Sequence, residues 1–413
     1  MNILMLCSTF PYPPTKGRKQ LRTYHLLQYL AQRHRVTLLT QRSQEVTDEE
    51  VKFLREQVAE LAIFALEKTA PPKKLIDKAK RLRTFIKEGT LPKILSSYSA
   101  DIADWVNTVV TNSTFDCIVC EDSADEIYIS PNWQNFFGVV LNLHCSEYSV
   151  YKQQLEIGDS KNELKDQINL SFRRRYERSY LNKFSAIITV TEIERRIIKK
   201  LDPESHVVTV ANGVDLKKFP RRVTNQGGQR MIFVGNMDRP FNIDAARLLA
   251  LEIFPEIRQR YPEAALELVG ANPVPEILEL KNLPGIEVTG KVRCVVEYLH
   301  WATVFVIPIR QGFGLKNRTL EAMAAGVPVV GSDRALSGLQ VDGANVPLRA
   351  MRANTIEEYV YAIARLFSES KLRAKLSENG RKLVETEYTW DKVGQKYERV
   401  LTEACNKINK SPN

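Results

Sequence analysis

One stretch of the chain, residues 303–332 (TVFVIPIRQGFGLKNRTLEAMAAGVPVVGS), constrains the fold more than any other. An apolar, β-branched run over 304–309 predicts a buried parallel strand, and residues 327–331 predict a second one. Between them lie a glycine-containing loop and a short helix over 320–324, which Gly326 ends. A strand–loop–helix–strand unit of this kind is typical of open α/β sheets, which bind their ligands at the carboxyl ends of the strands.

The loop before this helix carries groups that suit an anionic ligand. Gly314 lets backbone N–H groups approach a ligand, and the helix N-terminus adds partial positive charge. Lys316 and Arg318 place two cations at the helix start, where the helix dipole disfavours them unless an anion is bound. Glu321 follows closely and is suited to accept hydrogen bonds from a sugar hydroxyl. A diphosphate beside a ribose would satisfy all these groups; an ordinary basic surface loop is the alternative.

The segment GFGLKNRTLEAMAAGVPVV resembles the donor-site signature of the retaining glycosyltransferase family 4, whose fold is called GT-B. Three further segments resemble family elements in the expected order: PYPPTKGRKQLR (11–22), VTVANGVD (208–215) and MIFVGNMDRPFNIDAARLLA (231–250). The resemblance covers nearly the whole chain. It implies two Rossmann-like, doubly wound parallel-sheet α/β domains that face each other across a cleft.

This chain departs from the common family pattern at one position. That pattern has two glutamates separated by seven residues, and Phe313 stands where the first glutamate would precede Glu321. Gln311 is the nearest polar residue. Gly314, Lys316 and Arg318 fit instead a subgroup that has a G-x-K-x-basic pattern before LEAMA. The nucleotide diphosphate is therefore better specified by the sequence than the hexose.

The resemblance also implies roles for single residues. Lys316 and Arg318 would stabilise the charge that develops on the departing diphosphate, without a metal or other cofactor. His144, at the end of a predicted strand, would face the transferred sugar; a structural histidine is the alternative. The residues expected to contact the nucleotide-diphosphate sugar are Gly235, Asn236, Val292, Gly314, Leu315, Asn317, Thr319, Leu320 and Glu321. Gly17 and Glu147 are expected near the acceptor or in the cleft, although Gly17 would also ease the turn into a helix.

Three ranges describe the predicted domain organisation. Residues 1–220 are expected to form an acceptor-binding Rossmann-like domain, and residues 221–388 a donor-binding one. The polar segment RRVTNQGGQR, residues 221–230, has no hydrophobic periodicity and is the predicted linker. Residues 389–413 are expected to form a helix that crosses back to the first domain. Within that first domain, residues 47–99 are predicted to be largely helical.

The charge of the chain favours an anionic partner, because 59 basic residues outnumber 49 acidic ones and give a net charge of +10. Two predicted helical segments, 73–87 and 172–183, are rich in lysine or arginine and would suit an anionic membrane surface. Ordinary solvent-exposed helices are the alternative. Nucleic acid is not expected as a partner, because these basic residues lack interleaved aromatic residues and no recognised motif is present.

Composition indicates a cytoplasmic protein, either free or peripheral at the inner face of the membrane. No run of eighteen apolar residues is present, so no membrane-spanning helix is expected. The six cysteines are scattered. Cys117 and Cys120 fall within an apparent buried strand, DCIVCE, and this placement disfavours a zinc or redox site.

The leading hypothesis is therefore a retaining glycosyltransferase that moves a sugar from a nucleotide-diphosphate sugar to an acceptor hydroxyl. The acceptor would be a glycan or a lipid-linked molecule, in the synthesis of a glycan, polysaccharide or glycolipid. The missing first glutamate leaves one alternative open: a non-catalytic protein of the same fold that binds a nucleotide sugar or serves as a scaffold.

Overall fold

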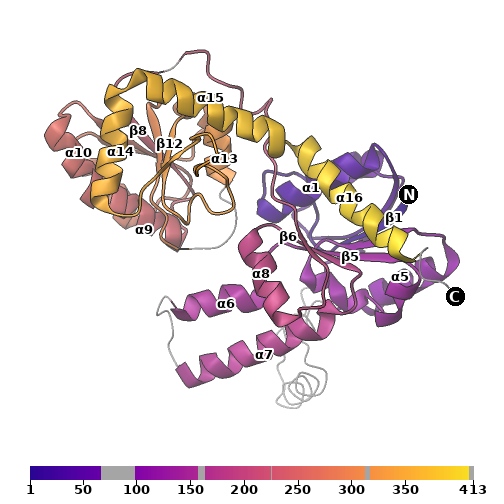
Figure 1. Ribbon diagram of the computed structural model, residues 1–413. Helices are drawn as coiled ribbons and strands as arrows, with labels where there is room; N and C mark the ends of the chain where they lie inside the picture. The colour runs from indigo at the N-terminus through magenta and orange to yellow at the C-terminus, as the bar shows by residue number, and fades with distance from the viewer. Residues whose placement is uncertain (67–97, 157–162, 225, 312–316, 409–413) are drawn as a thin grey trace. The chain divides into compact units, whose positions relative to one another are not determined.

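The computed structural model describes residues 1–66, 98–156, 163–224, 226–311 and 317–408 (Figure 1). The chain divides into two compact units. Unit 1 comprises Met1–Ala211 and Val393–Asn413, and unit 2 comprises Asn212–Lys392. Each unit is built on its own sheet. No helix among the described residues is long and apolar enough to cross a membrane.

Unit 1 is organised around a seven-stranded parallel sheet with the strand order β3-β2-β1-β4-β5-β6-β7. The chain runs outward from β1 through β2 to β3 and then returns to β4 on the other side of β1. The strand order therefore reverses between β1 and β4, as in doubly wound sheets. The strands are β1 (Asn2–Cys7), β2 (Arg35–Arg42), β3 (Glu60–Ala65), β4 (Cys117–Cys120), β5 (Gly138–Leu143), β6 (Ala186–Thr189) and β7 (Val207–Thr209).

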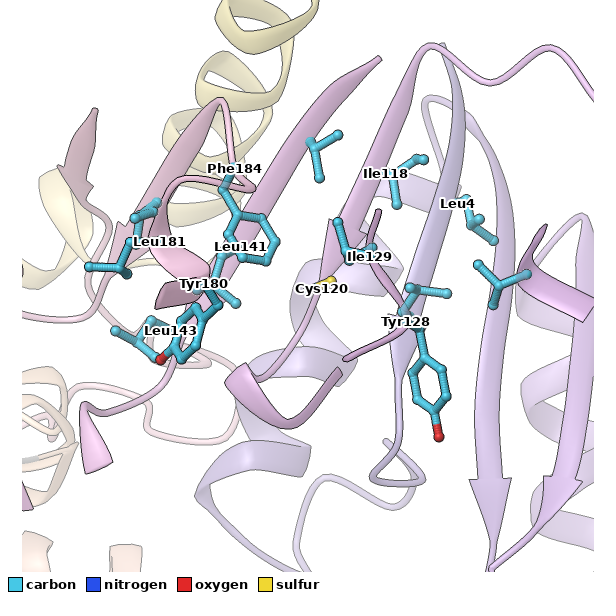
Figure 2. Close-up of a cluster of buried hydrophobic side chains, with 14 of the residues drawn as sticks. Leu4, Ile118, Cys120, Tyr128, Ile129, Leu141, Leu143, Tyr180, Leu181 and Phe184 are labelled. Atoms are coloured by element: carbon cyan, nitrogen blue, oxygen red, sulfur yellow. The ribbon is translucent and has the colours of Figure 1, made fainter. Parts of the chain in front are cut away.

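Helices surround this sheet, and its central strands are buried, apart from Asn2 at the start of β1, because both faces are covered. Figure 2 shows part of the resulting core, in which Leu4, Ile118 and Leu141 of neighbouring strands lie near Tyr128 and Tyr180. The helical segments are α1 (Arg18–Ala31), α2 (Asp48–Gln57), α5 (Ala100–Asn112), η1 (Ser123–Tyr128), η2 (Pro131–Asn135), α6 (Glu147–Glu156), α7 (Glu163–Leu181), α8 (Glu192–Leu201) and most of α16 (Trp390–Ile408).

One secondary-structure prediction in this unit was wrong at residues 60–65. Residues 47–99 were expected to be largely helical, but Glu60–Ala65 (ELAIFA) forms the edge strand β3, paired in parallel with β2. The strand is short and only partly buried, so its sequence does not alternate clearly between apolar and polar residues. The helix α2 before it was predicted, and it begins with a capping box in which Thr47 and Glu50 bond each other's backbone N–H groups. The basic segment 73–87 lies outside the described residues.

Unit 2 contains a six-stranded parallel sheet with the order β10-β9-β8-β11-β12-β13, which reverses between β8 and β11. The strands are β8 (Arg230–Val234), β9 (Ala265–Val269), β10 (Ile286–Gly290), β11 (Val304–Ile307), β12 (Val329–Gly331) and β13 (Met351–Arg352). The helical segments are α9 (Pro240–Leu248), η3 (Leu249–Ile253), α10 (Phe254–Arg260), α11 (Pro275–Leu278), η4 (Glu279–Asn282), α12 (Val295–Trp301), α13 (Asn317–Ala324), α14 (Ile356–Ser368) and α15 (Ser370–Glu387). The predicted fold class, two doubly wound parallel-sheet α/β domains, is confirmed.

The helix after β8 has an irregularity that explains its two-part form. A π-helical turn, Leu249–Ile253, separates α9 from α10. Pro255 follows within the first turn of α10, and a proline inside a helix removes one backbone hydrogen bond. Local widening to a π-turn accommodates that loss, so the helix continues without a break.

The polar segment 221–230, predicted to be a linker, is anchored in unit 2 by Arg222, whereas most of its described residues are exposed. Arg222 is only 6% exposed, and its Nη1 donates a 2.6 Å hydrogen bond to the carbonyl oxygen of Ala302. Its backbone N–H donates to the carbonyl of Ala325 at 3.0 Å. Contacts of this kind assign the segment to unit 2, which begins at Asn212.

Candidate functional site

In doubly wound sheets, ligands bind at the carboxyl ends of the strands, where the strand order reverses. In unit 2 this point lies between β8 and β11. Gly235 follows β8, and the chain after β11 leads to helix α13. The predicted donor loop therefore belongs to the segment that starts at the reversal point. Gly314, Leu315 and Lys316 of that loop lie outside the described residues.

Helix α13 presents a charged pair at its start. Nη1 of Arg318 donates a 2.5 Å hydrogen bond to Oε2 of Glu321, one turn along the helix. The Arg318 side chain is 41% exposed, whereas that of Glu321 is 13% exposed. Burial raises the pKa of Glu321, and the positive charges of Arg318 and Lys218 oppose that rise. The pair thus offers an accessible cation, together with a carboxylate that could exchange its partner for a ligand hydroxyl.

The NGVD segment reaches the start of the same helix, a contact that the sequence did not predict. Nδ2 of Asn212 donates a 3.2 Å hydrogen bond to Oδ1 of Asn317. Asp215 has a local role instead, because its Oδ1 accepts hydrogen bonds from the backbone N–H groups of Lys217 and Lys218 at 2.8 and 3.3 Å. This turn holds Lys218 close enough to Glu321 to affect its pKa. Among the described residues, Lys218 is therefore a second cation near Glu321, beside Arg318.

Two predicted donor residues, Thr319 and Leu320, have fully buried side chains. Oγ1 of Thr319 donates to the carbonyl of Ala335 at 3.3 Å, and Leu320 packs in the core of unit 2. These side chains anchor α13 to the sheet. Thr319 and Leu320 can therefore contact a ligand only through their backbone, because the first N–H groups of a helix lack intrahelical partners.

The glycines at the strand ends of unit 2 make close backbone contacts. A Cβ on Gly270, whose φ is +158°, would lie 1.6 Å from the carbonyl oxygen of Gly235. A Cβ on Gly235 would lie 2.8 Å from the side chain of Asn242, which donates a hydrogen bond to the carbonyl of Asn236. Packing within the protein alone thus accounts for both glycines. The side chain of Asn236 is exposed and that of Val292 is half-buried.

In unit 1, the strand order reverses between β1 and β4, and a buried polar network lies beside this point. Its centre is Glu121, which directly follows β4 and is 1% exposed. Tyr397 of α16 donates to Oε1 at 2.6 Å, and Asn142 and Thr23 donate to Oε2 at 2.9 and 3.1 Å. Burial raises the pKa of Glu121 although these donors favour its ionised form. The three hydrogen bonds hold the carboxylate of Glu121 in one position.

Arg22 completes the network and is 1% exposed. Its Nε and Nη2 donate to Oδ1 of Asn142 at 3.2 and 3.0 Å, and its Nη1 donates to the carbonyl of Ala211 at 3.0 Å. None of the residues Arg22, Glu121, Asn142 and Tyr397 was predicted from the sequence as a site residue. Glu121 had a detectable signal, because a carboxylate directly after a buried strand of an α/β sheet falls at the ligand-binding edge.

His144 follows β5 and lies beside this network. Its Nε2 is 4.0 Å from Oε2 of Glu121, and its side chain is 10% exposed. Burial lowers the pKa of His144 to about 3, and the nearby Arg22 adds to the effect. The imidazole is therefore neutral near pH 7 and can donate or accept a hydrogen bond.

A second set of charged groups surrounds the ends of β1 and β4. Lys19 pairs with Asp122, and Ser8 donates to Asp125 from both its backbone N–H and its hydroxyl. Burial raises the pKa of Asp125 to about 7. The pKa of Asp122 is shifted in the opposite direction. Burial would raise it, but the charge of Lys19 holds it below its usual value.

The two residues expected near the acceptor are found in different environments. Gly17 is the N-cap of α1 with extended backbone, φ −178°, and a Cβ there would meet only the Gln20 side chain. Any residue can adopt this extended backbone, so the geometry does not distinguish the two interpretations of Gly17. Glu147 begins α6 and pairs with Arg173 of α7 at 2.8 Å, so its carboxylate already has a partner within unit 1.

The cysteine pair of DCIVCE lies in β4, where both Cys117 and Cys120 are buried. In the part of the chain that the structure describes, no group of three or more histidine, cysteine or acidic residues could hold a metal ion. These cysteines are thus part of the core of unit 1.

Comparison with known proteins relates unit 2 to a family. Residues 228–369 match the family described as Glycosyl transferases group 1. The Bacillus subtilis protein "Putative glycosyltransferase YtcC" is 27% identical over 252 residues, which cover 54% of this chain and 62% of that protein. Spore coat protein SA of the same organism is 23% identical over 245 residues, covering 52% of this chain and 64% of that protein. The chain thus matches less than two thirds of the length of either relative.

Solved structures show the same two-unit architecture over nearly the full chain. Sucrose-phosphate synthase from Thermosynechococcus elongatus aligns with a TM-score of 0.64 at 16% identity and covers 98% of this chain and 100% of that one. HepE from Anabaena, in complex with UDP, has a TM-score of 0.64 at 12% identity and the same coverage. TarM has a TM-score of 0.63 at 13% identity, with coverage of 97% and 98%.

These findings agree with one another. The family match covers the α13 segment, and the structural matches extend the fold to both units. The fold is that of GT-B proteins. The family model that matches unit 2 describes glycosyl transferases, and one of the two relatives is named a putative glycosyltransferase.

Proposed function

We propose that this protein is a retaining glycosyltransferase of family 4 that uses a nucleotide-diphosphate sugar as its donor. The observation that carries the proposal is the pair of Arg318 and Glu321 at the start of α13. The pair lies in the segment that begins where the sheet order of unit 2 reverses, and it falls within the matched range 228–369. A cation and a carboxylate at a helix start suit a diphosphate attached to a ribose.

In this proposal, charges of the protein stabilise the leaving group. Arg318 and Lys316, helped by backbone N–H groups of the α13 turn, would bind the diphosphate as negative charge develops on it. Glu321 would then accept hydrogen bonds from the ribose hydroxyls. No metal or other cofactor is assigned to this step. HepE, a structural neighbour, was solved with UDP, which supports a nucleoside diphosphate as the ligand class.

Unit 1 would bind the acceptor and present His144 to the transferred sugar. A neutral imidazole suits this task because it can hydrogen-bond a hydroxyl without placing a second cation beside the oxocarbenium-like centre. Glu121, Asn142 and Arg22 hold the neighbouring backbone and side chains in place. The acceptor would be a glycan or a lipid-linked molecule, and we place the protein in the cytoplasm, at or near an anionic membrane surface.

The experiment measures donor turnover. The protein is incubated with UDP-, GDP-, ADP- and TDP-glucose, with glycerol as a simple acceptor hydroxyl, and release of nucleoside diphosphate is followed by chromatography. Proton NMR reads the anomeric configuration of the product, which a retaining enzyme keeps. Arg318→Ala should lower the rate, whereas Arg247→Ala on α9, which breaks an exposed pair with Glu276 of α11, should not.

Two results would decide between transfer and binding alone. Release of nucleoside diphosphate with retention supports the proposal. Tight nucleotide binding without turnover of any donor, with or without glycerol, would favour the non-catalytic alternative, for which the missing first glutamate at Phe313 is the motivating observation.

A further inference from the structure

Helix α7 presents one face that no described residue covers. Residues 164, 167, 168, 171, 174, 175, 178 and 179 are all exposed, and helical spacing places them on a single continuous arc. Side chains of the opposite face have partners within unit 1: Arg173 pairs with Glu147, Tyr176 donates to Glu126, and Glu177 accepts from Ser146. Figure 1 shows α7 beside α6, with which it forms a helical hairpin.

The exposed face changes in character along the helix. Near its start, Leu164 is 80% exposed and Ile168 is 57% exposed. One to three turns later, Arg174, Arg175 and Arg178 project from the same arc and, with Ser171 and Ser179, line a hollow of about 420 Å³. Leu164 and Arg178 are separated by about 20 Å along the axis, from a rise of ~1.5 Å per residue. A flat partner that contacts both ends must therefore lie along the helix.

The arginines have no acidic partner among the residues that the structure describes. Between Ile168 and Ser179 the exposed arc carries only serine and arginine, so it is a surface of one charge sign. Guanidinium groups and hydroxyls are the donors that bind phosphate oxygens. The apolar residues at the other end suit a non-aqueous phase rather than a free phosphate.

Other partners fit this face less well. Single-stranded nucleic acid requires aromatic side chains on which bases stack. The aromatic residues of α7 are Phe172, Tyr176 and Tyr180, and they point inward, with Tyr176 and Tyr180 almost fully buried. An exposed arc with arginines and an apolar end, but no aromatic residue, suits an anionic lipid surface better than a single-stranded nucleic acid.

We infer that the exposed face of α7 docks on an anionic lipid bilayer. Leu164 and Ile168 enter the headgroup region, and Arg174, Arg175 and Arg178 bind lipid phosphates, with their aliphatic stems lying along the surface. The inference rests on the placement at an anionic membrane surface proposed above and names the surface that attaches; it does not depend on glycosyl transfer.

Vesicle flotation with the full chain tests the inference. Vesicles are made of phosphatidylcholine alone or with 30% phosphatidylserine, at 0.1 M and 0.5 M salt. We expect binding only with phosphatidylserine, and weaker binding at the higher salt. Arg174→Ser, Arg175→Ser and Arg178→Ser combined should lower the partition coefficient about 100-fold, from about fivefold per arginine. Leu164→Ser combined with Ile168→Ser should lower it at least about tenfold.

A matched control keeps the net charge equal. Arg196→Ser, Lys200→Ser and Arg399→Ser combined remove three exposed cations from other helices of unit 1. Binding should stay within about twofold of wild type, because attraction to anionic lipid falls off within a Debye length of the surface. An equal loss in this control would show general charge attraction and overturn the inference. Absence of binding to anionic vesicles, or binding unchanged in the α7 variants, would also overturn it. So would full displacement by 10 mM inorganic phosphate at constant ionic strength, which would show a soluble-anion site.

Discussion

The hydroxyl of Tyr397 donates a 2.6 Å hydrogen bond to Oε1 of Glu121, and neither side chain is more than 1% exposed. The bond joins helix α16, at the end of the chain, to the residue that follows β4 of the first sheet. Glu121 in turn receives hydrogen bonds from Asn142 and Thr23. The last helix of the chain is thus connected to the polar network beside His144.

Tyr397→Phe tests the strength of this connection. The change removes one donor from a buried carboxylate. Leaving a buried charged acceptor without that donor costs about 1–3 kcal/mol. We expect urea denaturation to show a free energy of unfolding of unit 1 that is lower by that amount. Tyr361→Phe, at a tyrosine that is 62% exposed in α14, should change stability little. Equal effects in the two variants would contradict a role for the Glu121 bond.

Asp125 should make stability depend on pH. Burial raises its pKa to about 7 in the folded protein, whereas the unfolded chain should have a value near ~3.9. The folded state therefore keeps a proton that the unfolded state has lost between these values. Its stabilising contribution is complete below about pH 4 and disappears as the pH rises through about 7.

Asp125→Asn removes this dependence. Relative to the variant, the wild type should lose about 2–4 kcal/mol of unfolding free energy between pH 4 and pH 8, measured by urea unfolding at each pH. Asp104→Asn, which changes an exposed carboxylate of α5, serves as the control and should follow the wild-type curve. Parallel curves for wild type and Asp125→Asn would show that this carboxyl titrates normally.

Gly270→Ala should disrupt unit 2. The new Cβ would lie 1.6 Å from the carbonyl oxygen of Gly235, so the backbone at the ends of β8 and β9 would have to separate. We expect a loss of more than about 3 kcal/mol, seen as a lower melting temperature or as loss of folded protein. Gly290→Ala is the matched comparison, with a φ of +68° but no atom within 4 Å of the added Cβ. It should cost only about 1–2 kcal/mol.

The sequence predicted those parts of the fold that depend on local patterns. Apolar runs located strands to within one or two residues, as for Val304–Ile307, which was predicted at 304–309, because a buried parallel strand is continuously hydrophobic. Residues 60–65 were misassigned because an edge strand is only partly buried and its pattern is weak. Pairing with β2 over a sequence separation of more than 20 residues determines this strand, and no local window contains that information.

In the candidate site, too, local patterns were predicted and contacts between distant segments were missed. Arg318 and Glu321 were predicted because they lie on one short segment, and the structure brings their side chains into contact. Thr319 and Leu320 lie between them in sequence, yet the helix turns both side chains into the core. Arg22 and Tyr397 were missed because their partners, Asn142 and Glu121, are distant in sequence and meet only in the folded sheet.

The central claim is that the start of α13 binds a nucleoside diphosphate, and calorimetric titration tests it most directly. UDP, GDP, ADP and TDP are each titrated into wild type, Arg318→Ala and the control Arg247→Ala. The account predicts that one nucleotide class binds wild type and the control equally, and that Arg318→Ala weakens it by about 10- to 150-fold, from ~1.5–3 kcal/mol for a charge-assisted bond. Absence of binding by all four, or equal affinity in Arg318→Ala, would contradict the account.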